Sequence, residues 1–172
     1  MQPKWFEREF SFDLPLEMYP HILQRLRDTP ARLEALVSGV ADETLARRDG
    51  EKWSIKEHAG HLCELEAVWC GRLEDYEAGQ ERLRPADLQN RATWDGNYNA
   101  RPVGEILAAF RAARKGFVEK LAQAGEDFAA RSALHPRLDQ PMRVIDGAFF
   151  SAEHDDHHLA HISQLLRKFG RV

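Results

Sequence analysis

The sequence predicts an all-α protein, most simply a four-helix bundle with long connections between helices two and three and between helices three and four. Four long segments carry apolar residues at helical spacing. No two segments show the alternating pattern of paired strands. The 172 residues, 43% of them hydrophobic and 30% charged, have the size and balance of one soluble domain, residues 1–172.

The first predicted helix covers about residues 15–37. Pro15 suits its first turn, where the missing N–H removes no helical hydrogen bond. Pro20 and Pro30 fall within the same apolar pattern. Because proline inside a helix removes a hydrogen bond and crowds the preceding turn, we expect a break or kink in this segment.

The second predicted helix covers about residues 54–78. Ser54 is followed three residues later by Glu57, the pattern of a capping box, in which each side chain satisfies a free N–H at the helix start. Cys63 and Cys70 are separated by about 10 Å of helical rise. A disulfide needs Cα atoms within about 7 Å, so we expect two reduced thiols.

The third helix is expected from after Pro102 to about Ala124, and the fourth from about Asp146 to Phe169. Between helices two and three lies the connection 80–101, which is long enough to be either mobile or functional. The stretch 124–144 contains two prolines and is expected to cross the bundle end as a loop with a short turn.

Composition and charge exclude several classes of protein. The net charge of −4 argues against a broad basic face for nucleic acid. No stretch approaches the roughly 20 apolar residues that cross a bilayer. Residues 1–12 mix charged and aromatic side chains, unlike a signal peptide. We therefore expect a cytoplasmic protein that binds neither nucleic acid nor membrane.

Histidine is the unusual residue: four of the eight histidines lie within residues 154–161. Residues four apart share a helix face, so two pairs, His154/His158 and His157/His161, could each hold one metal ion. On a helical wheel, the apolar residues after this cluster, Ile162, Leu165 and Phe169, mark the side that faces the core. His154 and His158 fall on that side, and His157 and His161 fall nearer the rim. The wheel therefore favours His154 and His158.

Two histidines seldom complete a metal site, since catalytic zinc usually has three protein ligands and an open position. The second helix offers His58 and His61 on its apolar side, and the wheel alone slightly prefers His58. The alternative is a hydrogen-bonded or pH-sensing histidine cluster without metal. His21 and His135 are isolated and are expected at surface or capping positions.

Two motifs resemble the DinB/YfiT-like superfamily of metalloenzymes. The string WSIKEHAGHL at residues 53–62 fits W-S-x-x-E-x-x-x-H-L, and HDDHHLAHI at residues 154–162 contains H-x-x-x-H. The resemblance extends from Phe10 to Phe169, including the order and spacing of the four helices. It implies a bundle that binds a divalent metal, nickel or zinc, at one end.

In that family the metal ligands are one histidine of helix two and two of helix four. Carried over by position, the resemblance implies the ligands His61, His154 and His158. The motif therefore selects His61 over the neighbour that the wheel slightly prefers. Three other histidines could then orient the ligands by hydrogen bonding: His58, His157 and His161.

The resemblance implies an enzyme acting on a small molecule. A three-histidine metal leaves positions for water and substrate, so it can support hydrolysis, or S-transfer from a small thiol of the bacillithiol or mycothiol type, as in relatives. The alternative is a non-catalytic metal-binding or stress-responsive bundle that acts through a protein partner. The resemblance also implies a homodimer.

The residues alone identify no general acid or base. Asp155 and Glu57 lie near the site in sequence but are equally well explained as exposed or capping residues. In the connection 80–101, Asn97 and Tyr98 either contact substrate over the bundle mouth or only cap the loop and the third helix.

Overall fold

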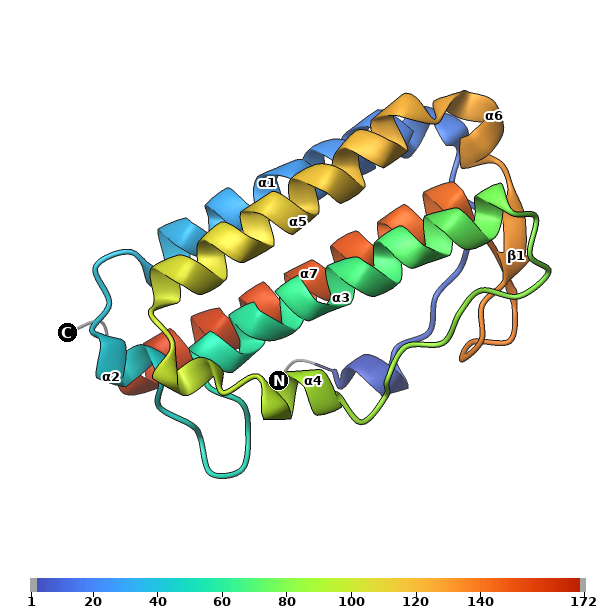
Figure 1. The fold of residues 1–172 in the computed structure, drawn as a ribbon. Coiled ribbons are helices and arrows are strands. Elements are labelled where there is room, and N and C mark those ends of the chain that lie inside the picture. Colours follow the sequence, from blue (N-terminus) through green and yellow to red (C-terminus); the bar gives the residue numbers. More distant parts are fainter. Residues whose placement is uncertain (1–2, 171–172) are drawn as a thin grey trace.

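The computed structural model describes residues 3–170 and confirms the four-helix bundle. Its long helices are α1 (Tyr19–Val37), α3 (Ile55–Glu77), α5 (Val103–Gln123) and α7 (Val144–Phe169). Figure 1 shows α1 and α5 in one layer and α3 and α7 in the other. The four helices begin and end within a few residues of the predicted positions.

The order of the helices around the bundle is α1, α5, α3, α7, because each of these helices packs against the next and α7 packs against α1. Connections 38–54 and 124–143 therefore join helices that are diagonal to one another. Connection 78–102 joins the neighbours α3 and α5. The sequence left this order open, since long connections permit several routes.

The expected break or kink in the first helix is only partly correct. A 3-10 turn, Leu16–Met18, precedes α1, and Pro20 lies in the first turn of α1. Pro30, however, lies inside a helix that continues to Val37. Proline cannot donate to the carbonyl four residues earlier. Here the guanidinium of Arg114 on α5 supplies the missing donor, with Nη1 3.1 Å from the carbonyl oxygen of Leu26.

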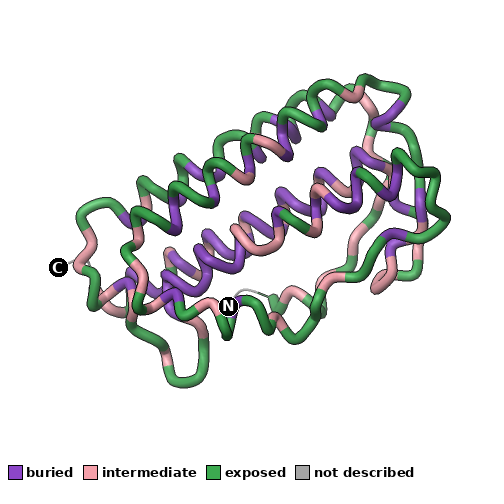
Figure 2. Tube along the Cα trace, viewed as in Figure 1, coloured by how far each residue is buried: buried purple, intermediate pink, exposed green. Residues whose placement is uncertain are grey.

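Helix α3 begins with the predicted capping box: the Glu57 N–H donates to Ser54 Oγ over 3.1 Å, and the Ser54 N–H donates to Glu57 Oε2 over 2.8 Å. Residues 54–62 are all buried, so the start of α3 is covered on every side (Figure 2). The ring of Tyr98 packs directly on Gly60, where a Cβ would lie 2.5 Å from ring carbons. Both cysteines are free, as predicted.

The connections contain short elements: helices α2 (Asp42–Leu45), α4 (Arg91–Asp95) and α6 (Gly125–Ala129), and further 3-10 turns at Trp5–Glu7 and Tyr98–Ala100. The expectation of no strand pair is wrong, because β1 (Ser132–Leu134) and β2 (Pro141–Arg143) pair antiparallel across one end of the bundle. Strands of three residues are too short to show an alternating pattern.

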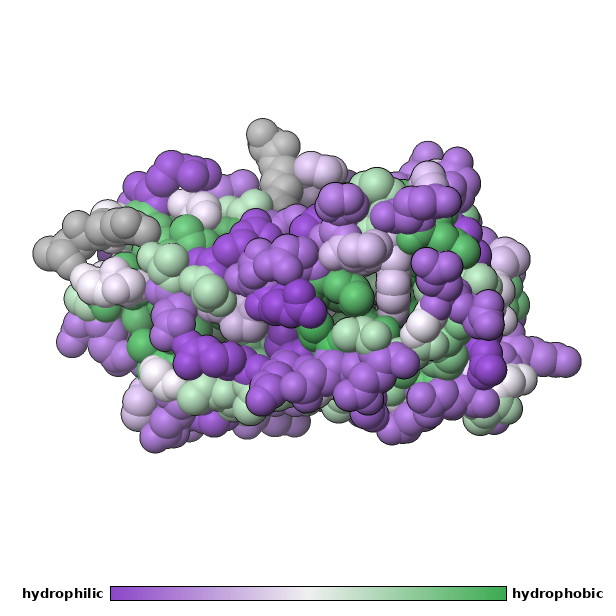
Figure 3. Space-filling view, turned by 90° about the horizontal axis from the view of Figure 1, so that it is seen from above, coloured by the Kyte–Doolittle hydropathy of each residue, from purple (hydrophilic) through white to green (hydrophobic). Residues whose placement is uncertain are grey.

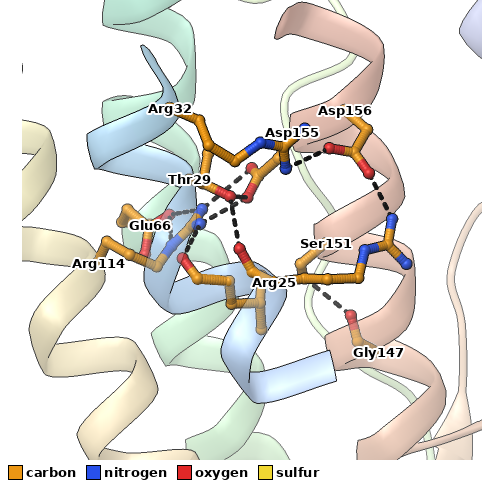
Figure 4. Close-up of polar contacts among 10 residues, drawn as sticks. Arg25, Thr29, Arg32, Glu66, Arg114, Gly147, Ser151, Asp155 and Asp156 are labelled. Carbon is orange, nitrogen blue, oxygen red and sulfur yellow. Dashed lines mark hydrogen bonds and ion pairs between the residues drawn. The ribbon is translucent and has the colours of Figure 1, made fainter. Parts of the chain in front are cut away.

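A buried polar layer divides the hydrophobic core into two clusters. Each long helix contributes one residue to it: Thr29, Glu66, Arg114 and Asp155 (Figure 4). Arg114 donates to Asp155 from Nη1 at 2.5 Å and Nη2 at 3.0 Å, and to Glu66 Oε1 from Nε at 2.9 Å. Thr29 Oγ1 donates to Asp155 Oδ2 over 2.9 Å. Asp155 is therefore a core residue, and its interpretation as an exposed or capping residue is wrong.

Charged and polar residues cover most of the face of the molecule seen in Figure 3, with smaller apolar areas between them. None of the helices within residues 3–170 is both long and apolar enough to cross a membrane.

Candidate metal centre

Three histidine side chains converge between α3 and α7. His61 lies in the second turn of α3, and His154 and His158 lie on successive turns of α7. One ring nitrogen from each of them falls within 4.8 Å of the others. The Nε2 atom of His154 is 3.4 Å from that of His61 and 3.1 Å from that of His158. The structure thus brings together the three side chains that the sequence predicts as ligands.

These distances fit a tetrahedral metal. Zinc–nitrogen bonds of 2.0–2.1 Å at tetrahedral angles place two ligand nitrogens about 3.3 Å apart. The donor set also fits, since imidazole suits both zinc and nickel. Among residues 3–170, no fourth His, Cys, Asp or Glu completes the cluster. A bound ion would therefore keep a position for water or substrate.

The second ring nitrogens of two of the three histidines are held by hydrogen bonds. His61 Nδ1 lies 3.0 Å from Thr93 Oγ1 on α4, and His158 Nδ1 lies 2.8 Å from His58 Nδ1. If His61 and His158 donate through Nδ1, their Nε2 lone pairs point into the cluster. His58 and Thr93 are thus positioned to fix the orientation and the tautomer of the two ligand rings, as hydrogen-bonding partners of metal ligands do. The Nδ1 atom of His154 is buried without a hydrogen-bond partner in the described part of the chain.

Burial keeps the cluster neutral. Desolvation lowers the pKa of His61 to about 4 and holds the pKa values of His154 and His158 well below the ordinary 6.5, where the neighbouring histidines lower them further. Neutral imidazole is the form that binds a metal. The ligands would therefore be ready for metal at neutral pH without first losing protons.

Replacing Thr93 by valine is expected to weaken metal binding about 10–100-fold, because the His61 ring would lose the acceptor that orients it. Competition with a chromogenic chelator measures the change in affinity. Thr44→Val, on α2 away from the cluster, is the matched control. Equal affinities in the two variants would contradict the orienting role of Thr93.

The remaining histidines of α7 lie beside the cluster. The His157 ring packs against Trp5, with centroids 5.6 Å apart, and His157 lines the cavity described below. His161 is half-buried and its ring stacks on that of His58 at 5.4 Å and 10°. The half-buried His161 agrees with the predicted placement near the rim of the site, whereas His157 is buried.

A cavity of about 270 Å³ adjoins the three histidines. Its walls come from α3, α7, the N-terminal segment and the connections 38–54, 80–101 and 124–143. Five Phe and Trp side chains line it: Trp5, Phe6, Trp53, Trp69 and Phe150. The cavity therefore lies beside the α3–α7 layer, where the N-terminal segment passes in Figure 1. His61, in the second turn of α3, places the histidines nearer the end of the bundle where α3 begins.

The N-terminal segment is tied to the site by an ion pair and by ring contacts. Arg8 Nη2 donates to Glu153 Oε2 over 2.5 Å. The ring of Trp5 meets the His154 ring edge-on, with centroids 4.9 Å apart. An aromatic cover of this kind limits the access of water to the histidines.

The burial of individual side chains tests several further expectations about residues near the site. His21 is exposed, as predicted, whereas His135 is buried and lines the cavity, so its placement at the surface is wrong. Asn97 is exposed, and the hydroxyl of Tyr98 donates to Glu64; neither residue lines the cavity. Glu57 has the capping role, paired with Arg48.

Sequence reasoning missed most of the residues that surround the site, of which five bear on its chemistry: Trp5, Arg72, Thr93, His135 and Arg137. Arg72 could have been found, because it continues the α3 face that begins at His61. The other four lie in connections or in the N-terminal segment. Their positions depend on how these segments fold back over α3 and α7, which no local periodicity predicts.

Known proteins resemble the chain in sequence and in structure. The DinB superfamily model matches residues 25–162. YfiT from Bacillus subtilis, described as a probable metal-dependent hydrolase with an unusual four-helix bundle topology, has a TM-score of 0.83 and 21% identity, over 96% of this chain and 95% of YfiT. No curated protein matches the sequence.

A mycothiol-dependent maleylpyruvate isomerase has a TM-score of 0.66 and 13% identity, over 88% of this chain. This chain covers only 62% of the isomerase. At these identities the two structures establish the shared fold. The family model extends from α1 to the histidine-rich turns of α7 and so includes all three converging histidines. The chain therefore belongs to the DinB superfamily.

Proposed function

We propose that the protein is a metal-dependent enzyme that acts on a small molecule at His61, His154 and His158. The observation that carries the proposal is the cavity of about 270 Å³ that opens onto the three converging nitrogens. Structural zinc sites are normally closed by four protein ligands. A site with three protein ligands beside a cavity is instead the arrangement of catalytic zinc.

The chain's own residues would hold, orient and shield the reacting groups. A bound zinc or nickel ion would supply Lewis acidity and lower the pKa of a coordinating water or thiol. Thr93 and His58 fix the ligand rings through hydrogen bonds. Trp5 and Trp53 pack on the histidine rings, with centroids 4.9 Å from His154 and 4.7 Å from His61, and restrict water.

Two reactions suit such a site: hydrolysis of an ester, amide or similar electrophile, and S-transfer from a small thiol. The likeness to YfiT supports the first, and the likeness to the mycothiol-dependent isomerase supports the second. Both cysteines of the chain are absent from the cavity walls, so a reacting thiol would come from a co-substrate. Four points stay predictions: that the metal is zinc or nickel, that a small thiol is a co-substrate, that the protein forms a homodimer, and that it is cytoplasmic.

The test compares protein loaded with zinc or nickel and protein stripped by a chelator. Hydrolysis is followed with 4-nitrophenyl esters, and S-transfer with bacillithiol or mycothiol and monochlorobimane. We expect turnover in one assay that is lost on stripping, restored by metal and absent from His158→Ala but retained in His21→Ala. Stoichiometric metal without turnover in either assay would favour a non-catalytic bundle that acts through a partner.

A further inference from the structure

The end of the cavity farthest along α3 from the histidines contains two arginines without a carboxylate partner. Arg72 is only 6% exposed, and neither Arg72 nor Arg137 forms an ion pair with any residue in the range 3–170. Nη2 of Arg137 is buried without a hydrogen-bond partner in that range. A buried guanidinium normally has an anionic or hydrogen-bonding partner, because desolvating an unpaired charge is costly.

The hydrogen bonds of His135 add a third donor at the same place. Its Nδ1 atom faces the backbone N–H groups of Arg137 at 3.3 Å and Leu138 at 3.1 Å, and accepting from them places the proton on Nε2. That Nε2–H faces Nη1 of Arg72 at 3.2 Å. The N–H of His135 and that of Arg72 therefore face each other with no acceptor between them. An acceptor within hydrogen-bond distance of both would remove this unfavourable contact.

The protonation states of these groups leave the corner with excess positive charge. Burial, together with Arg72 and Arg137, lowers the pKa of His135 to about 3, so the ring is neutral and has one N–H. Burial lowers the pKa of Arg72 to about 10, and the pKa of Arg137 is also lowered by burial. Both guanidiniums still carry their charge at neutral pH.

The carboxylates nearest to this corner are engaged elsewhere. Asp87 lines the cavity but accepts from the backbone N–H groups of Gln89 at 3.0 Å and Arg91 at 2.8 Å. Asp75 pairs with Arg84, with Oδ1 2.8 Å from Nη2. Asp75 thus acts on Arg72 only as a nearby charge and forms no ion pair with it, and Arg137 has no carboxylate partner within residues 3–170.

One face of α3 links this corner to the metal centre. His61, Leu65, Trp69 and Arg72 follow the spacing i, i+4, i+8 and i+11 and all line the cavity. The Trp69 ring lies 6.1 Å from the His154 ring and 5.3 Å from the guanidinium carbon of Arg72. A small molecule lying along Trp69 can thus reach both ends.

We propose that Arg72, Arg137 and the Nε2–H of His135 bind an oxyanion of the substrate, a carboxylate or a phosphoryl group, whose apolar body packs along Trp69 and Phe150. This proposal rests on the proposed function, since it assigns the substrate class of the same cavity. The anion would anchor one end of the substrate, and the reacting group would extend towards the three histidines. Bidentate geometry makes arginine well suited to both kinds of oxyanion.

Binding to metal-free protein tests the proposal separately from catalysis. Quenching of tryptophan fluorescence reports occupancy, because three tryptophans line the cavity. The probes are 3-phenylpropanoate, its neutral amide 3-phenylpropanamide, and 2-phenylethylphosphonate. We expect the carboxylate or the phosphonate to bind at least about 10-fold more tightly than the amide, as hydrogen bonds between charged groups predict. Whichever anion binds more tightly identifies the group that the substrate carries.

The variants Arg72→Gln and Arg137→Gln are each expected to remove most of this preference for anions. Arg167→Gln, an exposed arginine near the end of α7, is the matched control. Arg72 also donates to the carbonyl of Arg84, so circular dichroism must show that its variant folds; Arg137→Gln gives an independent test. Equal binding of anions and amide by the wild type, or a preference that persists in folded Arg137→Gln, would overturn the proposal.

The two proposals fail in different ways. Anion preference without metal or turnover would refute the proposed enzyme and support the anion site. Metal-dependent turnover with no anion preference would refute the anion site alone.

Discussion

Replacing His158 by alanine is expected to remove most of the metal from the protein. Loss of one of three ligands should weaken binding by more than the about 10–100-fold that loss of an orienting hydrogen bond costs. The Nε2 atom that is lost lies 3.1 Å from that of His154. Within residues 3–170 no carboxylate or cysteine belongs to the cluster, so none is in place to act as the third ligand. Plasma mass spectrometry of untagged protein purified without chelator measures the metal content.

Three further variants sharpen this result. His61→Ala and His154→Ala should lose metal as His158→Ala does, and His58→Ala should lose only part of the affinity, because it acts through the His158 ring. His21→Ala is the control, since His21 is exposed and belongs neither to the cluster nor to the cavity lining. Equal metal content in His158→Ala and His21→Ala would exclude the proposed ligands.

Replacing Arg114 by methionine is expected to lower the free energy of unfolding by about 3–5 kcal/mol. The change leaves two buried carboxylates, Asp155 and Glu66, without their common cation. It also leaves the Leu26 carbonyl without a donor, because Pro30 has no N–H to offer it. Burial already raises the pKa of Glu66 to about 7, partly offset by Arg114. Urea unfolding followed by circular dichroism measures the loss.

Arg111→Met is the matched control for this prediction. Arg111 lies one turn earlier on α5 and pairs with Glu34, but its side chain is 54% exposed. An exposed ion pair contributes about 1 kcal/mol or less. Losses of similar size in the two variants would show that the polar layer does not stabilise the bundle.

The polar layer also bears on the metal centre, because Asp155 directly follows the predicted ligand His154. On a helix, neighbouring residues point about 100° apart. Asp155 therefore faces Arg114 in the core, while His154 faces the cavity. The ion pair thus helps to set the rotation of α7, and with it the direction in which His154 and His158 point.

Local chemistry determined the elements and the candidate ligands. Apolar spacing predicts the four long helices because each buries one face, and Ser54 with Glu57 predicts the start of α3 because a capping box needs only residues three apart. The H-x-x-x-H spacing places His154 and His158 on one face of a single helix. The family motif, rather than the periodicity, selects His61.

Only the tertiary structure decided how these elements are arranged and what surrounds the histidines. Pro30 is accommodated within α1 because Arg114, 84 positions later in the sequence, donates to the carbonyl that the proline leaves free. His135 lies in the cavity because the connection after α5 folds back over α3 and α7. Such contacts join residues far apart in the chain, and their energies depend on burial and on partners that no local pattern contains.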